Sequence, residues 1–322
     1  MKRNLLTIFS VLVIVGGLPL GYYIKSHDIK QNDSKTTAAE AQALVQIDEI
    51  SQEPATSNIK PSRELATPID YNQADKNDIL HMMLNSIDYY DSVSGTMIFS
   101  SDNKNVVNVV DFQSELSTAS AYSRYEQYYI DDSDNISLEY ILSSECTFSN
   151  LVFCNQNSEI SIFPNDKTYI YQNDFITRLD EAVPIKDDER VSFADDGYPV
   201  YRYRANPTNV TMSSMCIFPQ EIAMGYLNDT SLWEVSDIVN YNELICFQIK
   251  GVPNNDYGAK LNVSQFEFLV DVNTGALVKY QGYDKDGNLS DFMYTENLKF
   301  DDKADSVTPF SDNLISQYSQ IQ

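Results

Sequence analysis

The chain has 322 residues, of which 43% are hydrophobic and 21% charged, so most of it can build a folded core and wholesale disorder is excluded. Asp and Glu number 47 against 22 for Lys and Arg, a formal net charge of −25. No basic stripe is present, which argues against nucleic acid as a partner and against polybasic docking on anionic lipid.

The first 25 residues predict a membrane anchor. Leu5–Ile24 is a stretch of 20 residues without a charge, and at helical rise it spans about 30 Å, the thickness of a bilayer core. The alternative is a cleaved signal peptide, but Pro19–Tyr23 places bulky residues where a signal protease needs small ones. Because Lys2 and Arg3 favour the cytoplasmic side, we expect a single-pass cell-membrane protein with its folded part outside.

Residues 26–70 predict a flexible polar linker. They are rich in Gln, Ser, Thr, Ala, Asn and Glu, they contain Pro54, Pro61 and Pro68, and they lack aromatic residues. The folded domain is expected at 71–302, because that stretch carries nearly all the aromatic residues. A loose polar tail is expected at 303–322.

The folded domain begins with a predicted helix over Asn77–Tyr90. Its apolar residues recur at helical spacing on one face, at Ile79, Leu80, Met83, Leu84, Ile87 and Tyr90. A second helical patch is expected from Pro219, because proline suits the first turn and Glu221 suits the positive end of a helix.

After the first helix the hydrophobic period changes to two, which predicts strands. The alternating stretches are Val107–Val109, Ser158–Phe163, Lys167–Tyr171, Tyr201–Arg204, Gln265–Val272, Ala276–Tyr283 and Leu289–Phe300. The last three are separated by the turns Asn273–Gly275 and Asp284–Asn288 and predict an antiparallel meander. One helix followed by many antiparallel strands predicts an α+β fold, with a strongly curved antiparallel sheet wrapped around one or two helices.

Three segments carry a resemblance to a known family. They are Asp78–Thr96, then Ile217–Ala223 followed by the strand Leu244–Gly251, and lastly the D-x-x-T-G hairpin Phe268–Tyr280 followed by the D-x-D-G turn Asp284–Asn288. Together they resemble the LolA-like half-barrel family, which includes the lipoprotein carrier LolA and the sigma-factor regulators of the RseB/MucB type. The resemblance covers about residues 75 to 300.

The resemblance implies a concave apolar cavity that binds an acyl chain or a protein partner without catalysis. An envelope-stress sigma-factor regulator, a lipoprotein-handling protein, a lipid or lipoprotein ligand and a membrane-bound regulatory partner are the roles and partners it suggests. The stub Met1–Asn4 is too short to hold a sigma factor, so the chain is not expected to be the anti-sigma factor itself. Two other functions stay open: a structural or adhesive cell-surface domain, and a surface hydrolase that uses carboxylates.

Cysteines suggest one covalent feature. Cys146 and Cys154 flank Ser149-Asn150, a predicted turn, and would face each other across a hairpin, which makes them a candidate disulfide pair. The alternative is two free core thiols. Cys216–Cys246 is a weaker pairing.

No residue pattern predicts catalysis, a cofactor or a metal. The chain lacks G-x-S-x-G, P-loop and G-x-G-x-x-G motifs. His81, on the first helix, has no second His in the folded part to act with. The acidic turns Asp131–Asn135 and Asp284–Asn288 allow a calcium site, but ordinary turns explain them better. The 22 Tyr and 15 Phe suit a ligand cavity, although the pleated faces of a large sheet explain them better.

Overall fold

A computed structural model describes residues 64–100, 105–132, 136–155, 158–173, 182–195, 199–208 and 211–321. The predicted anchor at 1–25 and most of the predicted linker lie outside the described residues. In the part of the chain that is described, no helix combines the length and the apolar character needed to cross a membrane.

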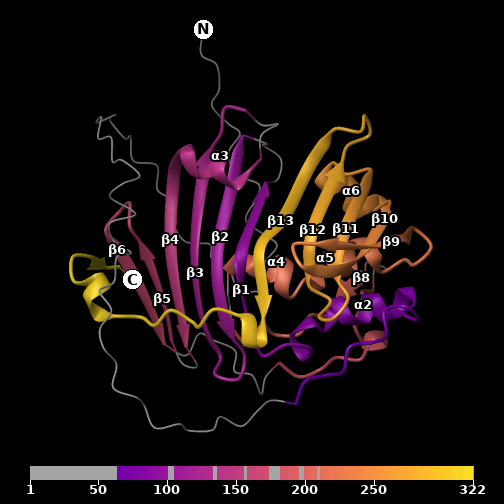
Figure 1. The fold of residues 1–322 in the computed structure, drawn as a ribbon, viewed down its shortest axis with the longest axis horizontal. Coiled ribbons are helices and arrows are strands. Elements are labelled where there is room, and N and C mark those ends of the chain that lie inside the picture. The colour runs from indigo at the N-terminus through magenta and orange to yellow at the C-terminus, as the bar shows by residue number, and fades with distance from the viewer. Residues whose placement is uncertain are drawn as a thin grey trace. The chain divides into compact units, whose positions relative to one another are not determined.

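The described residues form one curved, open sheet of twelve strands (Figure 1). From edge to edge the strands are β14 (Ser319–Gln320), β6 (Thr168–Asn173), β5 (Ser158–Phe163), β4 (Glu145–Asn155), β3 (Ser120–Tyr129), β2 (Val106–Glu115), β1 (Ser92–Ser100), β13 (Leu289–Phe300), β12 (Leu277–Tyr283), β11 (Gln265–Asp271), β10 (Leu244–Gly251) and β9 (Trp233–Tyr241). All neighbours are antiparallel except β14, which runs parallel to β6. The predicted α+β class and curved antiparallel sheet are confirmed.

Two meanders meet at the centre of this sheet. Strands β1–β6 form one and β9–β13 the other, and they join where β1 pairs with β13, for example at Phe99 and Met293. A separate two-stranded sheet holds β7 (Val191–Phe193) and β8 (Pro199–Tyr201). The strand expected at Tyr201–Arg204 is therefore wrong beyond Tyr201, because the Arg204 side chain turns into the protein interior instead.

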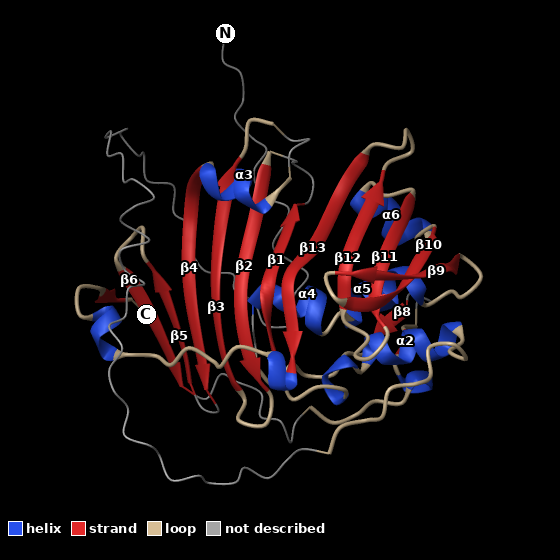
Figure 2. Ribbon diagram, in the orientation of Figure 1, coloured by secondary structure: helices blue, strands red, loops and turns tan. Residues whose placement is uncertain are grey.

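Several helices accompany the sheet (Figure 2). They are α2 (Lys76–Leu84), α3 (Leu138–Ser143), α4 (Ser214–Ile217), α5 (Gln220–Leu227) and α6 (Asn255–Leu261), with 3-10 turns at Ser86–Asp88, Asp187–Glu189, Thr211–Ser213, Asp301–Lys303 and Asp312–Ile315. The helix expected at Pro219 is confirmed as α5, with Pro219 as its N-cap. Helix α2 is shorter than expected: it ends at Leu84, and the C-cap Asn85 donates from its side chain to the His81 carbonyl at 2.9 Å.

Helices and the C-terminal segment cover parts of both faces of the sheet. Helices α2, α4 and α5 pack on the face that carries Met97, Phe268 and Met293, which we call the inner face. On the opposite, outer face, α3 covers a cluster around Ile98 and Val109. A second outer-face cluster lies under the C-terminal segment.

The C-terminal segment corrects the prediction of a loose tail. Residues 303–321 cross the outer face and end in β14 (Figure 1). Four of its apolar side chains, Phe310, Leu314, Ile315 and Tyr318, pack on the sheet. The sequence suggests only a last helical turn near Asn313–Tyr318, and the structure has a 3-10 turn at Asp312–Ile315.

Candidate functional site

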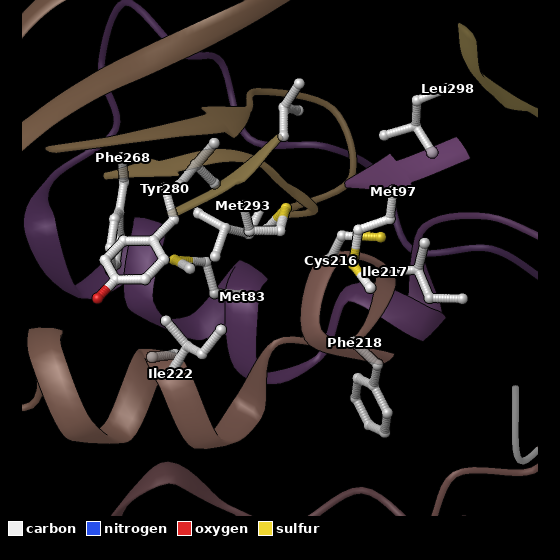
Figure 3. Packing of buried hydrophobic residues seen from close by; sticks show 14 of the residues in the cluster. Met83, Met97, Cys216, Ile217, Phe218, Ile222, Phe268, Tyr280, Met293 and Leu298 are labelled. Carbon is white, nitrogen blue, oxygen red and sulfur yellow. The ribbon is translucent and has the colours of Figure 1, made fainter. Parts of the chain in front are cut away.

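The hollow expected under the first helix is filled by the protein's own side chains. Met83 from α2 and Ile222 from α5 meet Phe268, Tyr280 and Met293 of the sheet (Figure 3), and each of the five is at most 9% exposed. The predicted acyl-chain cavity at this place is therefore wrong for the described residues. The physical reason is helix α5, which adds a second apolar layer beside α2.

Aromatic residues account for much of this filling. The Tyr226 and Tyr280 hydroxyls lie 2.6 Å apart, and Tyr280 donates to Asp291 Oδ2 at 3.0 Å. The Tyr226 ring packs within 5.2 Å of the rings of Phe266 and Phe268. Burial raises the pKa of both tyrosines well above their ordinary value, so both stay protonated. These aromatic residues therefore form part of the core, as the sequence analysis favoured over a ligand cavity.

Two arginines lie inside the protein next to this core. Arg190 is fully buried and donates to the Leu84 carbonyl at 3.1 Å and to Asn85 Oδ1 at 2.8 Å. Arg204 donates to the same Asn85 oxygen at 3.0 Å and pairs with Asp88 at 2.7 Å. Gln220 Oε1 accepts from Arg190 Nη1 and from the Arg204 amide. Burial lowers the pKa of Arg190, and Asp187 opposes that shift.

This arginine network holds distant segments of the chain together. It ties the segment around Arg190 and Arg204 to α2 and α5 through hydrogen bonds to Leu84, Ala182 and Gln220. Sequence reasoning missed it, because isolated arginines in an acidic chain have no periodic signature and because Arg204 was assigned to a strand.

An open groove lies at the ends of β9–β12, beside the start of α2. Its volume is about 470 Å³, within the usual range for binding sites. Its lining mixes charged, polar, aromatic and aliphatic residues: Lys76, Ser231, Leu232, Trp233, Glu234, Lys250, Gly251, Val252, Gln265, Phe266, Glu267 and Tyr283. We call it the Lys76–Tyr283 groove.

The Lys76–Tyr283 groove carries both signs of charge. Lys76 Nζ donates to the carbonyls of Thr230, at 2.7 Å, and Trp233, and it lies 5.2 Å from the centre of the Trp233 ring. Lys250 Nζ and Glu267 Oε1 form an exposed ion pair at 2.9 Å, whose hydrogen bond raises the pKa of Lys250. Among the lining residues, Ser231 Oγ donates to Asp229 Oδ1 at 2.7 Å. The groove therefore offers polar and charged groups to a partner.

The two cysteines of the predicted disulfide lie too far apart to form it. Cys146 and Cys154 lie on one strand, β4, instead of flanking a turn at Asn150, and neither forms a disulfide. Eight residues of strand separate their Cα atoms by about 26 Å, whereas a disulfide needs less than about 7 Å. A bulge at Thr147 also turns Cys146 to the outer face while Cys154 faces inward. The hairpin prediction is wrong because β4 continues through Asn150.

His81 and the turn Asp284–Asn288 make the following contacts. The His81 Nδ1 atom lies 2.7 Å from Asp187 Oδ2, and both side chains are about half exposed. In the turn Asp284–Asn288, Asp284 Oδ1 accepts from the backbone amides of Asp286 and Asn288. No group of metal-ligating side chains occurs in the described part of the chain. Within Asp131–Asn135, residues 133–135 lie outside the described residues.

No family model and no curated protein matches the chain. Solved structures that are similar to it include the MucA/MucB complex of Pseudomonas aeruginosa, with 13% identity over 75% of this chain and 60% of that one and a TM-score of 0.36. An uncharacterised conserved protein from Thermus thermophilus has 7% identity, over 76% of this chain and 97% of that one, and a TM-score of 0.34. A LolA superfamily protein from Nitrosomonas europaea has 6% identity, over 76% and 98% of the two chains, and a TM-score of 0.21.

MucB and the LolA superfamily are among the structures found, as the sequence resemblance predicts. This chain spans 60% of the length of the MucB chain that it matches.

Proposed function

We propose that this chain is a membrane-anchored, extracytoplasmic binding module that takes a protein partner at the Lys76–Tyr283 groove. One observation carries the proposal. The inner face, where an acyl chain would lie, is packed with Met83, Phe268 and Met293, while the groove at the ends of β9–β12 is open. Binding therefore takes place at the rim of the sheet and not beneath it.

The chemistry of the groove favours a protein over a lipid. An acyl chain needs a continuous apolar lining, whereas Trp233 and Phe266 are buried in the floor of this groove and its exposed side chains include the charged Lys250 and Glu267. Polar and charged side chains of this kind are typical of the rim of protein interfaces. The uncharged stretch Leu5–Ile24 supports anchoring, so the partner class we favour is a membrane-bound regulatory protein, confined to the same surface.

A second candidate function is a structural or adhesive surface domain without a bound ligand. The packed inner face favours it as well, since such a domain needs a closed interior. The two functions differ in one respect: a binding module contacts one defined partner through the groove, whereas an adhesive domain does not depend on the groove residues.

Site-specific photocrosslinking of the full chain in its own host tests the proposal. A photoreactive residue at Gln265, an exposed lining residue, should give one discrete crosslinked protein, and the same probe at exposed Glu145 on β4 should not. Adding Glu234→Arg in the groove should abolish that product, while the matched Glu145→Arg should leave it unchanged.

Two results would contradict the proposal. One is a Gln265 product that persists in Glu234→Arg, because the contact would then not involve the groove. The other is a stoichiometric acyl lipid on the purified chain in native mass spectrometry, which would restore the carrier function that the packed inner face argues against.

A further inference from the structure

The C-terminal segment 306–321, which we call the strap, crosses the outer face like a bound peptide. It touches successive strands: Thr308 bonds to Gln113 of β2, Phe310 packs on Phe153 of β4, and β14 pairs with β6. Before the strap, Asp305 bonds to Ser94 of β1. The segment therefore runs across the strands, as a peptide does in a groove, instead of extending the meander.

The sheet residues beneath the strap are buried, but the strap itself is not. Phe153, Ile160 and Ile162 are between 1% and 6% exposed, whereas Phe310 and Tyr318 are only partly buried. The Phe310 and Phe153 rings meet edge to face, with their centres 5.6 Å apart. Release of the strap would thus uncover a contiguous apolar patch, and such patches on soluble domains mark sites of protein contact.

Backbone bonds complete the peptide-like attachment. The amides of Ser319 and Ile321 donate to the carbonyls of Lys167 and Tyr169, both at 2.9 Å, so the strap adds a short parallel strand to the edge of the sheet. Thr308 donates from its amide at 2.7 Å and its hydroxyl at 2.8 Å to Gln113 Oε1. Strand addition for affinity, combined with side-chain pockets for specificity, is a common mode of peptide recognition.

The charge of the strap also differs from that of the rest of the chain. Its 16 residues contain one charged side chain, Asp312, in a chain of net charge −25. An uncharged segment avoids repulsion from this acidic protein. The same argument disfavours a second copy of the chain as the occupant, because two copies would bring two strongly negative molecules together.

We propose that the outer face of β4–β6 is a second peptide-binding site, which the strap occupies in cis. In trans the site takes a nearly uncharged, extended protein segment with aromatic and aliphatic side chains spaced like Phe310, Leu314, Ile315 and Tyr318. Such a segment displaces the strap. This site lies on other strands than the Lys76–Tyr283 groove, so it goes beyond the function proposed above.

The test uses the full chain and a fluorescent synthetic peptide of residues 306–321. A tethered strap acts as a competitor at roughly millimolar effective concentration, so the wild-type chain should bind the peptide weakly. The double variant Phe310→Ala/Ile315→Ala weakens the strap and should bind the peptide at least about tenfold more tightly. The matched control is Gln317→Ala, an exposed strap position, which should behave as wild type.

Three results of this binding test would overturn the proposal. No binding to a double variant that keeps wild-type circular dichroism, or equal binding to the variant and the wild type, would overturn the proposal. A wild-type dimer at the concentrations used would also overturn it, because the occupant would then be the strap of a second copy.

Should the double variant not fold, hydrogen exchange on the wild-type chain gives the answer. Release of the strap predicts that the Ser319 and Ile321 amides exchange well before those of β4 and β5. If the Ser319 and Ile321 amides exchange only through global unfolding, together with the amides of β4 and β5, the proposal is overturned.

Discussion

Arg204 pairs with Asp88 through two contacts, Nη1 to Oδ2 at 2.7 Å and Nη2 to Oδ1 at 3.0 Å. The guanidinium is 2% exposed and the carboxylate 28%. This fork is the main neutralising contact for Arg204, and it joins the turn after α2 to a segment more than a hundred residues away. Two buried cations in one network make that carboxylate important for folding.

Asp88→Ala should lower the free energy of unfolding by about 3 kcal/mol or more, because it leaves a buried guanidinium without its countercharge. Urea denaturation followed by circular dichroism measures the change. The matched control is Glu189→Ala, which removes only exposed pairs at 3.6 and 3.9 Å and should cost less than about 1 kcal/mol. Equal costs for the two variants would show that the network is not what holds this segment.

Gly275 allows the β11–β12 turn to contact helix α2. Its φ is +74°, and a Cβ there would lie 2.4 Å from the Met82 carbonyl carbon. Gly275→Ala should therefore push the turn off the helix and cost several kcal/mol in unfolding free energy. Gly287→Ala is the matched control, since its φ is +81° but nothing lies within 4 Å of its Cβ position. That variant should lower the unfolding free energy by only about 1–2 kcal/mol, because a Cβ there strains the left-handed backbone conformation but meets no neighbour.

Asp271 should make stability depend on pH. Burial raises its pKa above the ordinary 3.8, although bonds from Thr274 and Asn273 oppose the shift. Between the ordinary and the raised pKa the native state binds more protons than the unfolded chain, so this group lowers the unfolding free energy as pH rises. The destabilisation is complete above the raised pKa.

Asp271→Asn removes that titration. The stability of the variant relative to wild type should therefore increase from about pH 4 to about pH 7, whatever the constant cost of the substitution. Urea denaturation of both proteins across this range measures the difference. A difference that is constant, or that shrinks with rising pH, would argue against a buried ionised carboxylate at this position.

The four thiols should stay reduced and differ in reactivity. Burial raises the pKa of Cys246 to about 12 and also raises the pKa values of Cys154 and Cys216. Cys146 is only partly buried, so iodoacetamide should modify it first in the native protein. Intact mass spectrometry without reductant should give the mass of the fully reduced chain. A mass lower by two hydrogens would show instead that a disulfide has formed.

Much of the sheet could be predicted from local pattern. The strands Gln265–Asp271 and Leu277–Tyr283 alternate in hydrophobicity and are separated by a turn containing a glycine, and both features act over a few residues. Strand β4 could not be placed in the same way. Ser149-Asn150 has turn composition, but pairing of both residues with β3 keeps the strand extended, and the pairing with β5 begins at the next residue, Leu151.

The two candidate surfaces were also beyond sequence reasoning. The Lys76–Tyr283 groove joins residues from α2 and from the ends of β9–β12, and the strap site joins residue 310 to residue 153. Neither set shares a period or a motif, because the residues meet only when distant strands are assembled into one sheet.

The sequence by itself determined the α+β class, the first helix, the antiparallel meander and the absence of any catalytic motif, because these depend on spacing over a few residues. Only the tertiary structure decided that the inner face is full, that the cysteines stand on one strand and that the C-terminal segment lies on the outer face. Those outcomes depend on which side chains meet across the sheet, and close packing of distant residues is not encoded in any local period.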